Sequence, residues 1–160
     1  MSYLNDLNTI VNINSYTKNK HGVDRVGEIF DKWLEELGFE VNIYDRELIG
    51  NHRHYTSQHD KTAKKLLLLG HLDTVFPPNE FEEYSEDSDW IYGPGVCDMK
   101  GGNIVALQAL RELKEQNREI KNIDILFVSD EETGSDDSKH LTAKLASDCD
   151  YCFEIGRAHV

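Results

Sequence analysis

The chain has 160 residues, of which 39% are hydrophobic and 29% charged, a composition typical of a globular domain with one hydrophobic core. Its formal net charge of −13 argues against nucleic acid as a partner, because an acidic surface repels phosphate backbones. No apolar run approaches the length of a membrane span, and the first residues lack the features of a signal peptide. Three cysteines, an odd number, argue against a disulfide framework, so we expect a cytoplasmic protein without membrane association.

The first third of the chain alternates between helical and strand-like hydrophobic spacing. Helical spacing predicts a short helix over residues 3–11 and a longer one over residues 23–37, which Gly38 would end. Residues 39–44 alternate like a strand. The polar segment 45–65 carries three histidines and is expected to be a surface loop or a weak hairpin.

Two continuous apolar runs follow, Leu66 to Gly70 and Ile123 to Ser129, and such runs are typical of strands that are buried on both faces. The other expected elements are a short strand at 90–92, helices at 102–116 and 136–146, and a last strand at 151–154. Strands separated by helices favour right-handed crossovers. The order therefore predicts an α/β fold with a largely parallel sheet covered by helices, whose ligands lie at the carboxyl ends of the strands.

Acidic and histidine side chains follow several of these elements. His71 and Asp73 come directly after the strand at 66–70, and in extended chain they would point the same way. A carboxylate can hold the second ring nitrogen of a histidine that binds a metal. A solvated turn is the alternative interpretation of this segment. Asp98 lies between the Gly93-Pro94-Gly95 turn and the start of a helix, where it could also be a simple helix cap.

A second acidic run, Asp130-Glu131-Glu132, follows the strand at 123–129, and Glu154 ends the last expected strand. Consecutive carboxylates repel one another unless a cation or a proton intervenes. The alternative is an ordinary solvated surface run. One histidine with several carboxylates, all at strand ends, is a ligand set for two hard or borderline metal ions.

Three segments resemble the pattern of the zinc-dependent carboxypeptidase superfamily, which includes glutamate carboxypeptidase, acetylornithine deacetylase and succinyl-diaminopimelate desuccinylase: His71-Leu72-Asp73-Thr74-Val75, Tyr92-Gly93-x-Gly95 with Asp98-x-Lys100-Gly101-Gly102, and Asp130-Glu131-Glu132-x-Gly134-Ser135. The resemblance extends from the opening helix to Glu154 and implies a two-zinc exopeptidase-like catalytic domain. Pro94 is similar to the glutamate-carboxypeptidase-like and dipeptidase branches.

The resemblance also implies a role for each candidate residue. Those roles are His71 as a ligand of one zinc, Asp73 as the catalytic-site carboxylate that orients His71, Asp98 as the bridge between both metals with a cis peptide bond after it, Glu131 as the general base, Glu132 as a ligand of the second zinc, and Glu154 as an acidic ligand of the first. Cobalt or manganese could replace zinc. The implied reaction is hydrolysis of a peptide or amide bond in a small peptide or an N-acyl amino acid.

Two alternatives remain beside a carboxypeptidase or dipeptidase. One is an N-acyl-amino-acid deacylase of the same superfamily. The other is a non-catalytic module in which the acidic clusters hold a structural cation such as calcium. Calcium loops place oxygen ligands closely within one segment and use no histidine. The dispersed ligands and His71 therefore favour zinc.

The resemblance finally predicts how the chain is organised. We expect residues 1–154 to be the N-terminal part of the catalytic domain, because the family's enzymes are considerably longer. Their dimerisation domain would then lie outside this chain, which by itself would be an inactive fragment of a homodimeric enzyme. Residues 155–160 are what a common sequencing adapter encodes. We expect this tail to be non-native, and Glu154 would then keep only the first base of its codon.

Overall fold

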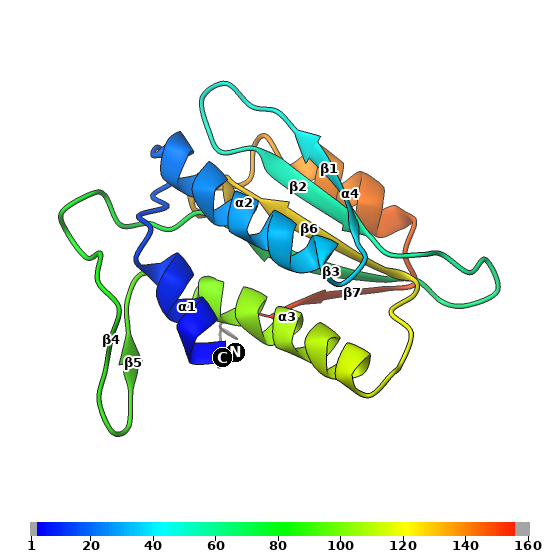
Figure 1. Ribbon diagram of the computed structural model, residues 1–160. Coiled ribbons are helices and arrows are strands. Elements are labelled where there is room, and N and C mark those ends of the chain that lie inside the picture. The colour runs from blue at the N-terminus through cyan, green and yellow to red at the C-terminus, as the bar shows by residue number, and fades with distance from the viewer. Residues whose placement is uncertain (1–2, 156–160) are drawn as a thin grey trace.

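A five-stranded sheet runs through the middle of the computed structural model, which describes residues 3–155 (Figure 1). Its strand order is β1-β2-β6-β3-β7, with bounds Glu40–Tyr44, His52–Thr56, Ile123–Val128, Leu66–His71 and Tyr151–Glu154. β3 pairs in parallel with both β6 and β7, whereas β2 pairs antiparallel with both β1 and β6. Only β2 therefore runs against the other strands of this sheet, and the predicted largely parallel sheet is confirmed.

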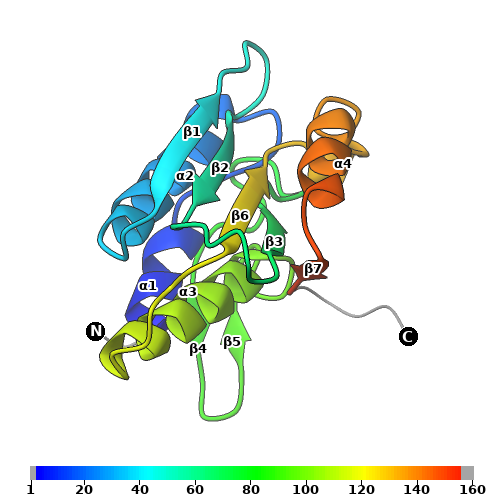
Figure 2. The same ribbon diagram turned by 90° about the vertical axis from the view of Figure 1, so that its right-hand side faces the viewer.

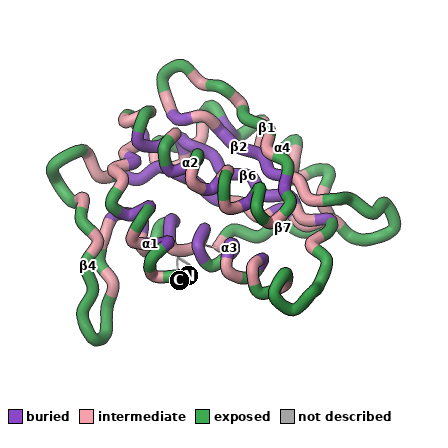
Figure 3. Tube along the Cα trace, in the orientation of Figure 1, coloured by how far each residue is buried: buried purple, intermediate pink, exposed green. Residues whose placement is uncertain are grey.

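Helices cover both faces of this sheet, as Figure 2 shows in side view. One face carries α1 (Tyr3–Val11), α2 (Lys20–Glu35) and α3 (Lys100–Glu115), and the other carries α4 (Lys139–Ser147). The larger core lies under the first three helices, around side chains such as Phe30, Leu107 and Phe127. A smaller cluster of Leu67, Leu126 and Val128 packs against α4. Figure 3 shows that burial is concentrated in the sheet and on the inward sides of α1, α2 and α3.

Three short features complete the described part. β4 (Ser85–Glu86) and β5 (Ile91–Tyr92) form an antiparallel hairpin that extends away from the α/β body (Figure 1). A 3₁₀ turn, η1 (Glu131–Thr133), follows β6. The expected tail at 155–160 lies outside the described residues except for Ile155. None of the helices within residues 3–155 combines the length and the apolar character that a membrane span needs.

The structure of residues 45–65 differs from the expected surface loop or weak hairpin at one point. Residues 45–51 and 57–65 form loops as expected, but residues 52–56 form β2, which pairs with β1 and lies in the interior of the sheet, with His52 fully buried and His54 only 9% exposed. Both rings contact carboxylates that are distant in sequence: His52 Nε2 lies 2.8 Å from Asp137 Oδ1, and His54 Nε2 lies 2.9 Å from Asp124 Oδ2. Buried polar groups are tolerated where such partners satisfy them. The hydrophobic pattern could not reveal a strand whose interior contacts are polar.

Asp124 on β6 is the centre of a buried ion-pair cluster. Its carboxylate is 1% exposed and lies 2.9 Å from His54, 2.7 Å from His59 and 2.8 Å from Lys65 Nζ. Burial alone would raise the pKa of Asp124, but the hydrogen bonds from these three side chains lower it to about 2. The cluster sits near the start of β6, at the opposite end of that strand from the 3₁₀ turn η1.

Replacing Asp124 should destabilise the fold. We expect Asp124→Asn to lower the free energy of unfolding at pH 7 by about 3 kcal/mol, because Lys65 and the two histidine rings would lose the buried carboxylate that pairs with them. The folded-state pKa lies below the usual value of about 3.9, so the stabilisation is complete above that value and is lost as the pH falls from about 4 towards 2. Urea unfolding across this pH range measures it, with the exposed Asp89→Asn as control. Parallel stability curves for Asp124→Asn and the unsubstituted chain would contradict the expectation.

Candidate metal centre

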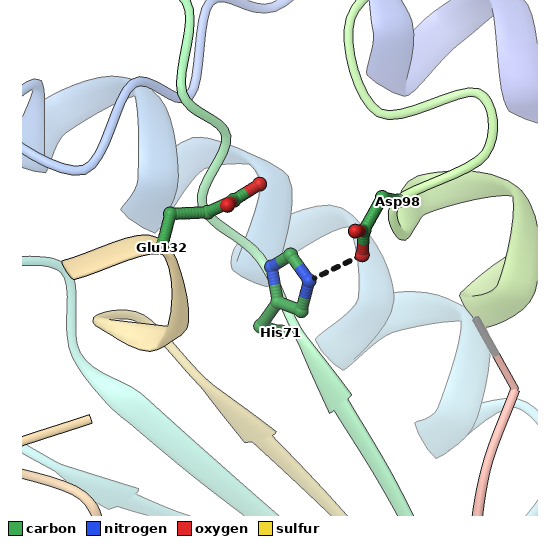
Figure 4. Close-up of side chains that lie close together, drawn as sticks. All are labelled: His71, Asp98 and Glu132. Carbon is green, nitrogen blue, oxygen red and sulfur yellow. Dashed lines mark hydrogen bonds and ion pairs between the residues drawn. The ribbon is translucent and has the colours of Figure 1, made fainter. Parts of the chain in front are cut away.

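His71 is the last residue of β3 and is buried, so its ring is held at the carboxyl end of a central strand. The ring Nε2 lies 3.0 Å from Asp98 Oδ1, as Figure 4 shows beside Glu132. The same nitrogen lies 3.8 Å from Glu131 Oε2. Asp98 comes from the turn before α3, and Glu131 and Glu132 come from η1 after β6. β3 and β6 pair with His71 opposite Val128, so both strands deliver their following residues to the same edge of the sheet.

The donor atoms of His71, Asp98 and Glu132 all lie within 4.8 Å of one another, a spacing that ligands around one cation can reach. Within residues 3–155, this is the one such group of three or more histidine, cysteine or carboxylate side chains. Glu154 does not belong to it. It ends β7 beside Leu69, and its charge helps to raise the pKa of Glu131. Three of the four predicted metal ligands are therefore brought together.

Asp73 contacts the Nδ1 side of the His71 ring, whereas Asp98 contacts the Nε2 side. His71 Nδ1 lies 2.9 Å from the Asp73 backbone oxygen and 3.4 Å from Asp73 Oδ1. The other carboxylate oxygen of Asp73 accepts a 2.6 Å hydrogen bond from the Thr17 hydroxyl and a 3.2 Å bond from the Glu132 backbone N–H. One buried carboxylate thus joins the ring of one candidate ligand to the backbone of another. Thr17 was not identified from the sequence, where it lies in an undistinguished polar loop.

The close packing of the segment after Asp98 requires glycine at position 101. A Cβ on Gly101 would lie 2.1 Å from the Val96 backbone oxygen, so only glycine fits this close approach. The peptide bond between Asp98 and Met99 is cis, as the resemblance implies. Met99, which has no side-chain cap bond, is the cap of α3. The interpretation of Asp98 as a simple helix cap is therefore wrong.

Two further side chains of this segment position the site. The Asn103 side-chain amide donates a 2.8 Å hydrogen bond to the His71 backbone oxygen. Lys100 is 1% exposed, and its ammonium donates 2.9 Å hydrogen bonds to the backbone oxygens of Ile10 and Ile13 at the end of α1. Burial lowers the pKa of Lys100 to about 7. Sequence reasoning found Lys100 only as part of a motif and did not single out Asn103, because the partners of both side chains are backbone atoms far along the chain.

The charges at the centre are unbalanced. Burial alone would lower the pKa of His71, but Asp73, followed by Asp98 and Glu131, raises it to about 9. Burial, together with repulsion from Asp98 and Asp73, raises the pKa of Glu132 to about 7 against the attraction of His71. Several carboxylates thus face a single imidazole, and the buried Asp73 Oδ1 has no hydrogen-bond partner in the described structure. A divalent cation matches both the donor types and the excess negative charge.

Fold and site together define an α/β protein with a candidate histidine–carboxylate metal centre near the carboxyl ends of parallel strands. A model of peptidase family M20/M25/M40 matches residues 67–158. The chain belongs to this family, so the family resemblance of its motifs is confirmed.

Curated relatives are similar in sequence to most of this chain. Carboxypeptidase G2 of Pseudomonas sp. (strain RS-16) is 33% identical over 155 residues, which cover 91% of this chain and 36% of the relative. An acetylornithine deacetylase of Vibrio atlanticus is 29% identical, over 82% of this chain and 35% of the relative. The chain thus spans about a third of the length of these curated relatives.

Solved structures share its fold. Human carnosine dipeptidase 1 superimposes with a TM-score of 0.87 at 20% identity, over 99% of this chain and 39% of that one. A tripeptidase from Staphylococcus aureus gives a TM-score of 0.81 at 26% identity, over 98% of this chain and 43% of that one. These likenesses support the α/β fold with a largely parallel sheet that the element order predicts.

Proposed function

We propose that this chain provides the metal centre of a hydrolase that cleaves a peptide or amide bond in a small substrate, of the carboxypeptidase or dipeptidase type. One observation carries the proposal: the convergence of His71, Asp98 and Glu132, with Glu131 beside His71. The family membership and the names of the relatives support it. The chain spans about a third of the length of those relatives. We therefore assign the activity to the whole protein that the gene of this chain encodes, and we call it the parent protein.

Zinc is the metal that the donor set favours, because zinc accepts an imidazole nitrogen together with carboxylate oxygens, as cobalt and manganese also can. We assign His71, Asp98 and Glu132 to this centre, with Asp98 as the bridge if two ions bind and Glu154 as a further ligand. A bound zinc ion supplies a Lewis acid that polarises an amide carbonyl and acidifies water. The remaining steps belong to the side chains of this chain.

Glu131 is the proposed general base. Its carboxylate faces the same space as His71 Nε2, at 3.8 Å, and is partly exposed, so a water molecule can reach it. Glu131 takes a proton from the water that attacks the amide carbonyl and passes it to the leaving nitrogen. Asp73 keeps the His71 ring in place throughout, since it contacts the ring and the backbone of Glu132.

A deacylase that removes an acyl group from an amino acid is the second candidate function, because an acetylornithine deacetylase is among the relatives. It would use the same centre and the same base. A non-catalytic cation-binding module is the third candidate function, and in such a module Glu131 would have no catalytic role. Three further points remain proposals: that residues 1–154 are the N-terminal part of the catalytic domain, that the parent protein is a homodimer, and that it is located in the cytoplasm.

The test is metal-dependent hydrolysis by the parent protein. We expect it to cleave members of a panel of dipeptides and N-acetyl amino acids, to lose this activity after chelation, and to regain it when zinc is added back. Cleavage of N-acetyl amino acids alone would favour the deacylase. A folded, zinc-loaded parent protein that cleaves no member of the panel would leave the binding module as the better description.

A further inference from the structure

A cavity of about 390 Å³ opens directly beside the metal centre. Its volume falls within the range of about 300–1,000 Å³ that is usual for small-molecule sites. Most of its wall is apolar and comes from the segment after Asp73, the β5 strand and the turn before Asp98: Val75, Phe76, Phe81, Ile91, Tyr92 and Val96. Asp98 and Glu132, two of the three candidate metal ligands, form its remaining charged wall.

Several side chains of the apolar wall are exposed to solvent, and they lie together around one cavity rather than singly on the surface. Val75, Phe81 and Tyr92 are 49%, 40% and 44% exposed. The rings of Phe76 and Phe81 stack edge to face, with centroids 5.0 Å apart, so this side of the cavity is a preformed aromatic surface. An apolar group placed here would be removed from water and would contact these side chains.

The cavity contains nothing that would hold an anion. None of its lining residues is lysine, arginine or histidine, and its two charged groups are carboxylates. Lys100 approaches the wall at Gly95, but its ammonium donates to the backbone oxygens of Ile10 and Ile13 instead. No cationic side chain lines this space to pair with a substrate carboxylate, so an uncharged apolar group is the complementary occupant of the apolar wall.

We infer that this cavity binds an apolar side chain, aromatic or branched aliphatic, that adjoins the scissile bond of the substrate, and that Phe81 is a specificity-determining residue. The inference rests on the proposed function. Asp98 and Glu132 belong both to the cavity wall and to the metal centre, so a group in the cavity lies next to the bond that the centre would cleave. The substrates are then small peptides or N-acyl amino acids with an apolar side chain, and acidic side chains are disfavoured.

The first experiment measures specificity in the parent protein. Dipeptides are compared in pairs that place phenylalanine, alanine or glutamate on either side of the bond. We expect phenylalanine to be preferred over glutamate on one side. Phe81→Ala should lower kcat/KM for the phenylalanine substrate about tenfold more than for the alanine substrate, since the lost contact is to the larger apolar side chain. Phe81→Lys should raise the relative rate of the glutamate substrate, because it places a cation in the wall.

Trp90→Ala is the matched control. Trp90 is also an exposed aromatic residue of the hairpin region, at 68%, but it does not line the cavity. Circular dichroism establishes that each variant is folded. A preference for glutamate, or a phenylalanine preference that Phe81→Ala leaves intact, overturns the inference while the proposed function stands.

The second experiment does not depend on activity. Ligand-observed NMR on the zinc-supplemented 160-residue chain should show binding of N-acetyl-L-phenylalaninamide that is weakened in Phe81→Ala, with no binding of N-acetyl-L-glutamate in the same place. Equal binding of both probes, or binding that is insensitive to Phe81, overturns the inference. So does sedimentation that shows a dimer dissociated by Phe81→Lys, because a second copy would then occupy the apolar wall. Specific binding without any hydrolysis would support the cavity and count against the proposed function.

Discussion

Glu131→Gln is expected to lower hydrolysis by the parent protein about 10³-fold or more and to leave its affinity for zinc nearly unchanged. Glutamine has the shape of glutamate but does not take up the proton of an attacking water. Glu131 lies outside the group of donors within 4.8 Å of one another, although its carboxylate approaches His71 Nε2 to 3.8 Å. Removing its charge therefore affects proton transfer far more than it affects the metal ligands.

The measurement combines kcat at saturating substrate with zinc content determined by mass spectrometry. Glu119→Gln is the matched control, because that glutamate is 76% exposed and pairs only with Lys121 in the described structure. Glu119→Gln should retain the full rate. Near-normal turnover in Glu131→Gln would remove Glu131 from the role of base. Loss of zinc together with activity would make it a ligand instead.

Asp98→Ala is expected to weaken zinc binding by the 160-residue chain by about 100-fold or more, where the unsubstituted chain binds one tight ion. Asp98 supplies one of the three convergent donors, and its carboxylate is the one that contacts His71 Nε2. With alanine there, the convergent group would keep one imidazole and one carboxylate, too few ligands for a tight zinc site. Isothermal titration calorimetry with zinc measures both stoichiometry and affinity.

Asp136→Ala is the control for this variant. Asp136 is an exposed carboxylate that pairs with Lys139, so its loss removes the same charge without touching the centre. The Asp98 side chain is itself about half exposed, and its replacement should leave the core intact, which near-UV circular dichroism can verify. If Asp98→Ala binds zinc as the unsubstituted chain does, the assignment of Asp98 is wrong. If a folded unsubstituted chain binds no zinc, the centre needs ligands from outside this chain.

Much of the fold was predictable because its central strands are continuous apolar runs. Leu66 to Gly70 and Ile123 to Ser129 were correctly predicted as buried strands, and the helix after Asp98 was predicted to within two residues of its observed start. β2 was missed because its inward side chains are polar and are satisfied by carboxylates such as Asp124, 70 residues from His54. Local periodicity carries no information about such distant partners.

The site likewise contains residues that the sequence could predict and residues that it could not. His71, Asp98 and Glu132 were predictable because histidine and carboxylates at strand ends are chemically conspicuous. Thr17 and Asn103 were not, because each acts through a single hydrogen bond to a group 56 or 32 residues away. A hydroxyl or an amide in a polar segment has no distinguishing spacing. The predicted strand at 151–154 is present, but the sequence did not reveal that Glu154 stands apart from the three convergent donors.

The contacts of Asp73 also determine when this centre can form during folding. Its carboxylate joins Thr17 and Glu132, which are 56 and 59 residues away in opposite directions along the chain. Contacts of such long sequence separation form only after the chain has collapsed around its sheet. The donors are therefore scattered in the unfolded chain, and zinc should bind the native state alone. Added zinc should then raise the unfolding temperature by an amount that grows with the logarithm of the free zinc concentration once this exceeds the dissociation constant.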